Sequence, residues 1–252
     1  VALIAAIFNN NNQFTEAVDV TETYRLTDTL NVDVNRQNAK AYCMLKYYKT
    51  SINRYEALKA MGDRSFTTLY YLGVSQYADN WPYGARDNLL EAHKKNPMDV
   101  NVLYYLAKAC ARSSWKEEGI AYMNKAFDMV VPTDSMMIRL YDGLLECYKF
   151  HTKADPYEKI EVMKEAYSYT KKYTLFYQIA EIYDYQKDYV NAVHYYEKYM
   201  ALVPKNKQAA LDSEGNPLPN VDTMYQKARR RVEKIKVEDF FRNGAHDDYF
   251  EW

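Results

Sequence analysis

Tyrosine is the residue whose number and spacing stand out in this sequence. The chain contains 27 Tyr among 252 residues, beside 9 Phe and 3 Trp. Five of them take what we interpret as one equivalent position in five successive segments: Tyr42, Tyr70, Tyr104, Tyr141 and Tyr177. A tyrosine joins an apolar ring to a hydroxyl that forms hydrogen bonds, and this combination is common at protein interfaces. The chemistry that these residues suggest is therefore recognition of a partner.

Residue patterns typical of catalysis or metal binding do not occur in the sequence. It has no Gly-rich phosphate loop, no nucleophile elbow and no HExxH helix. No Cys lies two to four residues from another Cys, and the histidines are far apart: His93, His151, His194 and His246. Acidic pairs such as Glu117 and Glu118 are typical of a solvated surface. We therefore expect no enzyme activity, no catalytic residues, no metal site and no cofactor.

Charge and cysteine content exclude further classes of protein. With 33 Lys and Arg against 34 Asp and Glu, the formal net charge is −1, so nucleic acid is not expected as a partner. The three cysteines, Cys43, Cys110 and Cys147, lie far apart in apolar stretches, which indicates buried free thiols. The basic run from Arg229 to Arg231 is interpreted as the solvated face of a terminal helix, with contact to a phosphate or an acidic partner as the alternative.

The elements that must position the tyrosines follow from an internal repeat. Leu69–Gly73 returns 34 residues later as Leu103–Ala107, and more loosely as Leu140–Leu144 and Phe176–Ala180, with Ala41–Leu45 ahead of the series. Each copy opens an amphipathic helical stretch that is followed by a second one. Asp155 and Asp188 are expected to cap second helices, as are Asn80 and Ser114.

These motifs resemble the tetratricopeptide repeat (TPR), a unit of 34 residues made of two helices. Two copies follow the family pattern: Leu69, Leu72, Gly73, Ala85, Leu89, Ala92 and Pro97, and then Phe176, Ile179, Ala180, Tyr183, Ala192, Tyr196 and Pro204. Where a small residue is required, the fourth unit has Lys159, which departs from the pattern. The resemblance implies an all-α, right-handed solenoid of about five such helix-turn-helix units with a C-terminal capping helix.

The resemblance also implies a binding groove, because first helices line the concave face in this family. The five tyrosines would face that groove. Basic residues would flank them early and an acidic residue late, so the expected partner-binding residues are Tyr42, Lys46, Lys49, Tyr70, Tyr77, Tyr104, Lys108, Tyr141, Tyr148, Tyr177 and Glu181. The alternative is that these tyrosines only pack between adjacent first helices.

The repeat pattern divides the chain into four parts. Residues 1–34 are a partial repeat or an unrelated arm, 35–206 the TPR-like array, 207–221 a loop, and 222–252 a capping helix and tail. The longest apolar run, Val1–Phe8, is too short for a membrane span, which takes roughly 20 residues. The chain begins with Val, so we expect that a leader or an upstream domain was removed.

The sequence thus favours a scaffold that binds a protein or peptide in a Tyr-lined groove. The rival hypothesis is a structural subunit of a bacterial envelope complex that contacts its partners through its ends or its convex face. Both the cell envelope and the cytoplasm remain open as compartments, and no oligomeric state is predicted.

Overall fold

The computed structural model describes residues 1–208 and 222–243. These residues form thirteen α-helices and one short 3-10 helix, and this part of the chain contains no β-strand. The predicted all-α fold is therefore confirmed. The chain divides into two compact units, Val1–Thr152 (unit 1) and Lys153–Trp252 (unit 2). Most of the predicted loop and the tail beyond residue 243 lie outside the described residues.

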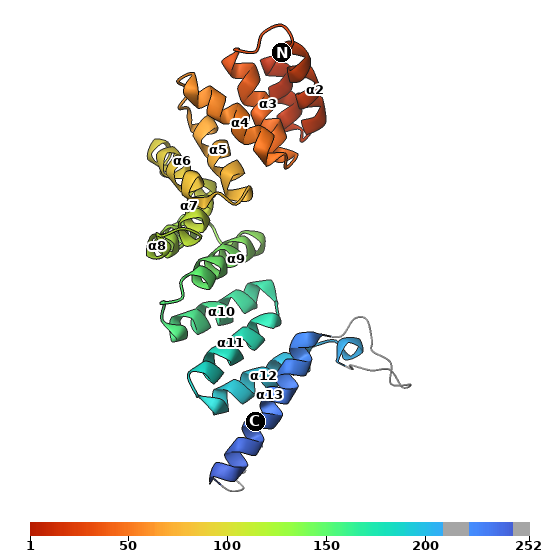
Figure 1. The fold of residues 1–252 in the computed structure, drawn as a ribbon, viewed down its shortest axis with the longest axis vertical. Coiled ribbons are helices and arrows are strands. Elements are labelled where there is room, and N and C mark those ends of the chain that lie inside the picture. The colour runs from red at the N-terminus through yellow and green to blue at the C-terminus, as the bar shows by residue number, and fades with distance from the viewer. Residues whose placement is uncertain (209–221, 244–252) are drawn as a thin grey trace. The chain divides into compact units, whose positions relative to one another are not determined.

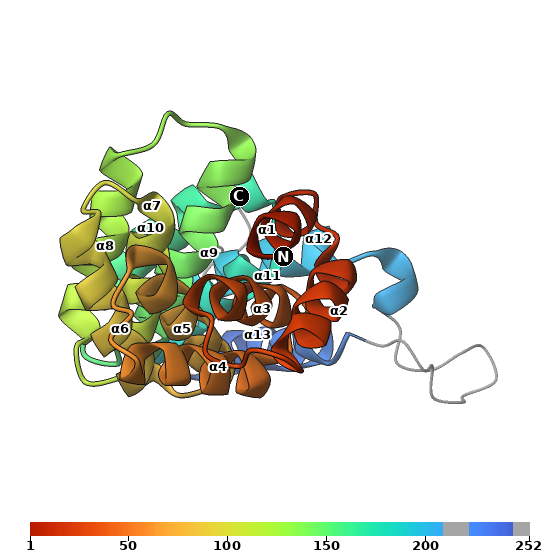
Figure 2. The ribbon, with the colours of Figure 1, turned by 90° about the horizontal axis from the view of Figure 1, so that it is seen from above.

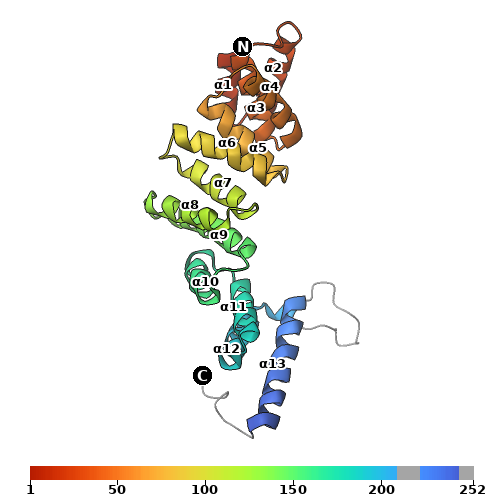
Figure 3. The ribbon, with the colours of Figure 1, turned by 60° about the vertical axis from the view of Figure 1, so that its left-hand side comes forward.

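Unit 1 is a stack of helical hairpins (Figures 1 and 3). Each helix packs on the next along the chain, and the first helices also pack on one another. In Figure 2 the second helices α4, α6 and α8 form the outer rim of this unit, with α3, α5 and α9 inside it. The elements are α1 (Ala2–Asn10), α2 (Phe14–Arg25), α3 (Val32–Met44), α4 (Tyr48–Ala60), α5 (Phe66–Ala78), α6 (Pro82–Lys95), α7 (Val100–Ala111), α8 (Lys116–Asp128) and α9 (Asp134–Phe150). The odd-numbered helices are the first helices, and the surface they form is called the first-helix face below.

The 34-residue period is set by the residues that cap the first helices. Asn31, Ser65 and Asp99 each accept a hydrogen bond from the backbone N–H three residues later, and Thr133 stands at the same spacing before α9. Such a cap satisfies one of the orphan donors of the first turn. Among the predicted caps of second helices, Asp155 and Asp188 are confirmed. The expectation for Asn80 and Ser114 is wrong, because Trp81 and Trp115 precede those helices and make no side-chain cap.

The positions of the five tyrosines, counted from the start of each helix, show that the five are not all equivalent. Tyr70 and Tyr104 lie five residues after their caps, whereas Tyr42 lies eleven after Asn31 and Tyr141 eight after Thr133. Tyr177 keeps the equivalence, because the buried residues around it follow the pattern around Tyr104. The error arose because α3 begins at Val32, earlier than expected, and because the Leu-Tyr pair lies one turn further along the 17-residue helix α9.

Small residues lie where paired helices approach each other. A Cβ at Gly73 would lie 2.6 Å from Leu89 Cγ and 3.1 Å from the carbonyl oxygen of Ala85. A Cβ at Gly119 would lie 2.8 Å from the carbonyl oxygen of Ala107. All three distances are shorter than ordinary van der Waals contact, so these glycines allow α5 to pack on α6 and α7 on α8. The three cysteines are free thiols buried in first helices, as predicted.

Unit 2 contains α10 (Pro156–Thr170), α11 (Thr174–Tyr185), α12 (Tyr189–Leu202), the 3-10 helix η1 (Lys205–Lys207) and α13 (Thr223–Asn243). The buried stripe Ala228, Val232 and Ile235 of α13 joins the core formed by α10 to α12, which includes Tyr196 and Tyr199. In Figure 1 α13 lies along α12. The predicted capping helix is therefore present, and it covers apolar side chains that α12 would otherwise expose.

No helix in the described residues is long and apolar enough to cross a bilayer.

Candidate functional site

A cluster of charged and aromatic side chains lies on the first-helix face of unit 1, and Glu146 is at its centre. Tyr77 Oη donates to Glu146 Oε1 at 2.5 Å, and Arg112 Nε donates to the same oxygen at 2.6 Å. Lys108 Nζ lies 3.0 Å from Glu146 Oε2. These residues come from α5, α7 and α9, so one carboxylate connects three successive first helices. We call Tyr77, Lys108, Arg112 and Glu146 the Glu146 cluster.

Tyrosine rings support the cations of this cluster. The guanidinium of Arg112 lies 4.5 Å from the centroid of the Tyr77 ring. Lys108 Nζ lies 4.9 Å from the Tyr104 ring centroid and donates to the Tyr104 hydroxyl at 3.2 Å. Arg139 of α9 lies 4.4 Å from the same ring and donates to Asn101 Oδ1 at 2.8 Å. Cation–π contacts of this kind hold long, flexible side chains in one orientation.

The electrostatics keep Glu146 ionised. Burial raises the pKa of Glu146, but hydrogen bonds from Tyr77 and Lys108 and the charge of Arg112 outweigh burial and bring the pKa below its ordinary value. Burial and the neighbouring carboxylate raise the pKa of Tyr77, which keeps its hydroxyl protonated as a donor. Burial lowers the pKa of Lys108, but Tyr104 and Glu146 outweigh burial and bring the pKa above its ordinary value, so Lys108 stays charged. The cluster therefore carries two cations and one carboxylate at neutral pH.

The other predicted tyrosines of unit 1 take different places. Tyr70 is half-buried, and its ring stacks on Phe66 and meets Tyr105 edge-on. Tyr141 is buried, with its ring centroid 4.9 Å from that of Phe127 on the second helix α8. Tyr148 is also buried. Tyr70 thus adjoins the aromatic group around Tyr77 and Tyr104, because Tyr105 contacts all three rings, whereas Tyr141 packs toward a second helix.

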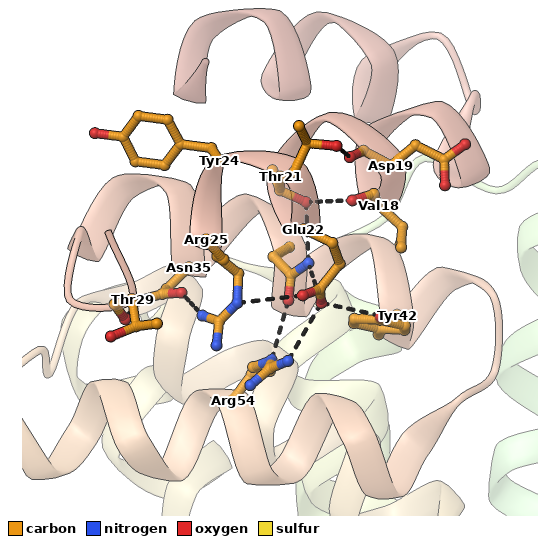
Figure 4. Close-up of polar contacts among 12 residues, drawn as sticks. Val18, Asp19, Thr21, Glu22, Tyr24, Arg25, Thr29, Asn35, Tyr42 and Arg54 are labelled. Atoms are coloured by element: carbon orange, nitrogen blue, oxygen red, sulfur yellow. Dashed lines mark hydrogen bonds and ion pairs between the residues drawn. The ribbon is translucent and has the colours of Figure 1, made fainter. Parts of the chain in front are cut away.

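Tyr42 belongs to a second polar cluster, which is formed by α2, α3 and α4 (Figure 4). Its hydroxyl donates to Glu22 Oε1 at 3.0 Å, and Arg54 Nη2 donates to the same oxygen at 3.2 Å. Asn38, which is fully buried, donates to Glu22 and to the hydroxyl of Thr21. Hydrogen bonds from Asn38 and Tyr42 and the charge of Arg54 outweigh burial and lower the pKa of Glu22. This cluster fixes the packing of three helices, and it directs the Tyr42 hydroxyl toward α2.

Of the two predicted lysines, Lys46 lies in the turn between α3 and α4, and Lys49 lies in the first turn of α4. Both are exposed, and Lys46 has a φ of 66°, the left-handed conformation that ends the helix. Together with Tyr47, Tyr48 and Asp79 they line a shallow surface cavity. No contact connects them to the Glu146 cluster.

In unit 2 the predicted groove residues lie close to the capping helix. Tyr177 is buried and meets the rings of Tyr196 and Tyr199 edge-on. Burial and Glu181 raise the pKa of Tyr177 to about 12. One turn after the exposed Glu181, Asp184 accepts two hydrogen bonds from Arg231 of α13, at 2.6 and 2.7 Å. Part of this face is therefore engaged by α13.

Three solved structures have an arrangement of helices similar to that of this chain. The C-terminal part of a TPR protein from Cytophaga hutchinsonii superimposes with a TM-score of 0.60 at 13% identity, over 100% of both chains. YrrB, described as a TPR protein with an unusual peptide-binding site, gives 0.58 at 11% identity, over 75% of this chain and 94% of that one. Pseudomonas aeruginosa PilF gives 0.56 at 14% identity, over 91% and 95%. The chain has the tetratricopeptide-repeat fold.

The predicted resemblance is thereby confirmed at the level of the fold. No family model matches the chain, and no curated protein matches it in sequence. At identities this low, the TPR fold says how the helices pack and says nothing of a particular partner.

The repeat register of the TPR fold explains which site residues the sequence analysis missed. Arg112 and Glu146 each lie thirteen residues after a cap, Asp99 and Thr133. They therefore hold equivalent positions in adjacent first helices, which is why their side chains meet. An alignment of the repeats on their caps would have found this pair, whereas an alignment on Leu-Tyr motifs shifts α9 by three residues. Arg139 was missed for the same reason.

Proposed function

We propose that this TPR chain is a non-catalytic scaffold that binds a protein or peptide on the first-helix face of unit 1. The observation that carries the proposal is the Glu146 cluster. Cations from two successive first helices are ordered on the buried rings of Tyr77 and Tyr104, and the Arg112 side chain there is 32% exposed. Tyrosine and arginine are enriched among the residues that dominate binding energy.

The TPR fold supports the same proposal. Stacked repeats create extended surfaces in which each first helix adds one row of side chains. YrrB, one of the similar structures, is described as having a peptide-binding site. In the present chain the proposed binding residues are Tyr70, Tyr77, Tyr104, Lys108, Arg112 and Arg139. Tyr42 and Tyr141 are not part of this proposal, because their side chains pack toward second helices.

The test is capture of partners from the native source by the full chain, followed by calorimetry on the captured partner. Arg112→Ala and Arg139→Ala together should weaken binding by about 2 kcal/mol, a typical loss for central arginines. Arg229→Ala is the matched control, because Arg229 is an exposed arginine of α13 in unit 2. Unchanged affinity in the double variant, with its helicity intact, would exclude the first-helix face as the binding site.

One observation favours the alternative hypothesis, that the chain is a structural subunit of an assembly. Three apolar side chains of α1 are exposed: Leu3 by 74%, Ile4 by 49% and Ile7 by 52%. An apolar surface of this kind, at the end of the repeat array, favours contact with another protein of an assembly. Capture of partners from the native source by the full chain tests it: the captured assembly should be lost when Leu3 and Ile7 are both replaced by Ser, and capture that is unchanged in this variant would exclude α1 as the contact.

A further inference from the structure

We infer that the partner segment bound at the Glu146 cluster is acidic, and that its Asp or Glu side chains bind Arg112, Arg139 and Lys108 in competition with Glu146. This inference rests on the proposed function, because it names the chemistry of the partner on the same face. Two observations support the inference. The arginines near the cluster have hydrogen-bond donors that no carboxylate uses, and Glu146 shows that the cluster already binds one carboxylate.

The cations near Tyr104 outnumber the carboxylates paired with them. In the described residues, Lys108 and Arg112 share Glu146 as their only acidic partner, and Arg139 pairs with none. Arg112 uses only its Nε for Glu146, so both terminal amino groups of its guanidinium have no acceptor within the described part of the chain. A guanidinium presents paired donors that match a carboxylate. A second carboxylate would therefore find unused donors at Arg112 and Arg139.

The two arginines are also ordered before any partner arrives. Each guanidinium lies on a tyrosine ring, Arg112 on Tyr77 and Arg139 on Tyr104. A side chain already held in one orientation loses less entropy on binding, which strengthens binding to a carboxylate that fits. The face is thus arranged for anionic groups, and a basic peptide would meet like charge.

Glu146 shows how a carboxylate is held at this place. It receives hydrogen bonds from a tyrosine hydroxyl and a guanidinium, and an ammonium group pairs with it. Its side chain is 16% exposed, so the acidic groups of a partner could approach the same donors from solvent. Glu146 therefore reduces the positive charge available to a partner. Replacement by Gln keeps the size of the side chain and an oxygen acceptor for Tyr77 but removes the competing charge.

The experiment is selection of a displayed random dodecapeptide library on the immobilised full chain. We expect an excess of Asp and Glu in the enriched peptides. The excess should disappear when the library is selected on the Arg112→Gln/Arg139→Gln variant and should persist on the control variant Arg229→Gln/Arg230→Gln. Thermal melting of each variant confirms that it is folded. Enriched peptides without an acidic excess, or an excess that survives in the first variant, would overturn the inference.

The failure of this inference differs from the failure of the proposed function. Neutral peptides whose binding still depends on Arg112 and Arg139 would retain the binding face and reject the acidic partner. No enrichment at all would count against both. Displacement of the acidic peptide by a single-stranded oligonucleotide at comparable concentration would instead indicate a general anion site and reject a peptide-specific one.

A separate measurement tests whether Glu146 competes with the partner. Fluorescence anisotropy with the most enriched acidic peptide should show a dissociation constant about fivefold lower for Glu146→Gln than for the wild type. That factor corresponds to roughly 1 kcal/mol, the upper range for a solvent-accessible charge pair. Equal or weaker binding by Glu146→Gln would show that Glu146 does not compete with the partner.

Discussion

Gly73 decides at the level of a single residue whether α5 can lie against α6. A Cβ at this position would lie 2.6 Å from Leu89 Cγ and 3.1 Å from the backbone carbonyl oxygen of Ala85. Leu89 is fully buried and can move little, and a backbone carbonyl cannot move without shifting α6. The tetratricopeptide pattern requires a small residue here because of this contact between helices.

Substitution at Gly73 should therefore destabilise unit 1 in proportion to side-chain size. Gly73→Ala should lower the melting temperature, and Gly73→Leu should cost about 1 to 3 kcal/mol or more through overpacking. Ala57→Leu is the control, since Ala57 is exposed in the last turn of α4. Urea unfolding followed by circular dichroism measures all three variants. A Gly73→Leu chain as stable as the control would contradict the position of Gly73 at the crossing.

At the level of a whole element, two kinds of contact hold the capping helix α13 against unit 2. Its apolar stripe enters the core of unit 2, and Arg231 forms two hydrogen bonds to Asp184 of α11. The pKa of Arg231 is raised above its usual range, chiefly by the hydrogen bond with Asp184, so the guanidinium stays charged. The ion pair orients α13, while burial of the stripe supplies most of the stabilisation.

Removing this ion pair should weaken the docking of α13. We expect Arg231→Met to lower the stability of unit 2 by about 1 kcal/mol, because both side chains are partly exposed and solvent screens their attraction. Arg229→Met serves as the control, because Arg229 pairs only with Glu233 on the same exposed helix surface. Hydrogen exchange of α13 amides is the readout. Equal protection in both variants would show that the apolar stripe alone holds the helix.

At the level of elements, the sequence was sufficient for the helix pairs, the glycine crossings and the capping helix. These follow from local signals, such as apolar periodicity, Gly73 and the charged helix with Val232 and Ile235. The site was only partly predictable. Tyr77, Tyr104 and Lys108 were identified, but Glu146 was not, because its role depends on which residues of α7 and α9 lie side by side. That register is marked by Thr133, the residue at the start of α9, which the Leu-Tyr motif obscured.

Across the whole molecule, many weak acids are buried in their neutral form. Burial raises the pKa of Cys110 to about 11 and that of Cys147 to about 12. It also raises the pKa of Tyr55, Tyr77 and Tyr196, with neighbouring charges adding to the effect. Because a raised pKa means that the folded state holds its protons more tightly, the stabilisation is complete below the unfolded pKa values and is lost as pH rises through the folded ones.

The free energy of unfolding should therefore decrease as pH rises above about 8.5, where an unfolded Cys begins to ionise, and decrease faster above about 10 for Tyr. Urea titrations at pH 7, 9 and 10.5 would measure this. The Cys110→Ala/Cys147→Ala variant should show a smaller decrease between pH 7 and 10.5, because two of the linked groups are gone. A stability that stays constant up to pH 10.5 would mean that these side chains are accessible to solvent.

The equal spacing of Asn31, Ser65, Asp99 and Thr133 has a consequence for how this protein can change in length. Excising residues 66–99 would join Ser65 directly to Val100, so that one cap replaces another of the same kind and α4 meets α7 with the inward residues still aligned. Duplication of the same stretch would likewise place a capping residue before each first helix. An insertion or deletion of any other size within a helix pair would rotate the following face. Gene rearrangement can thus lengthen or shorten the binding surface one row at a time, and protein engineering can do the same.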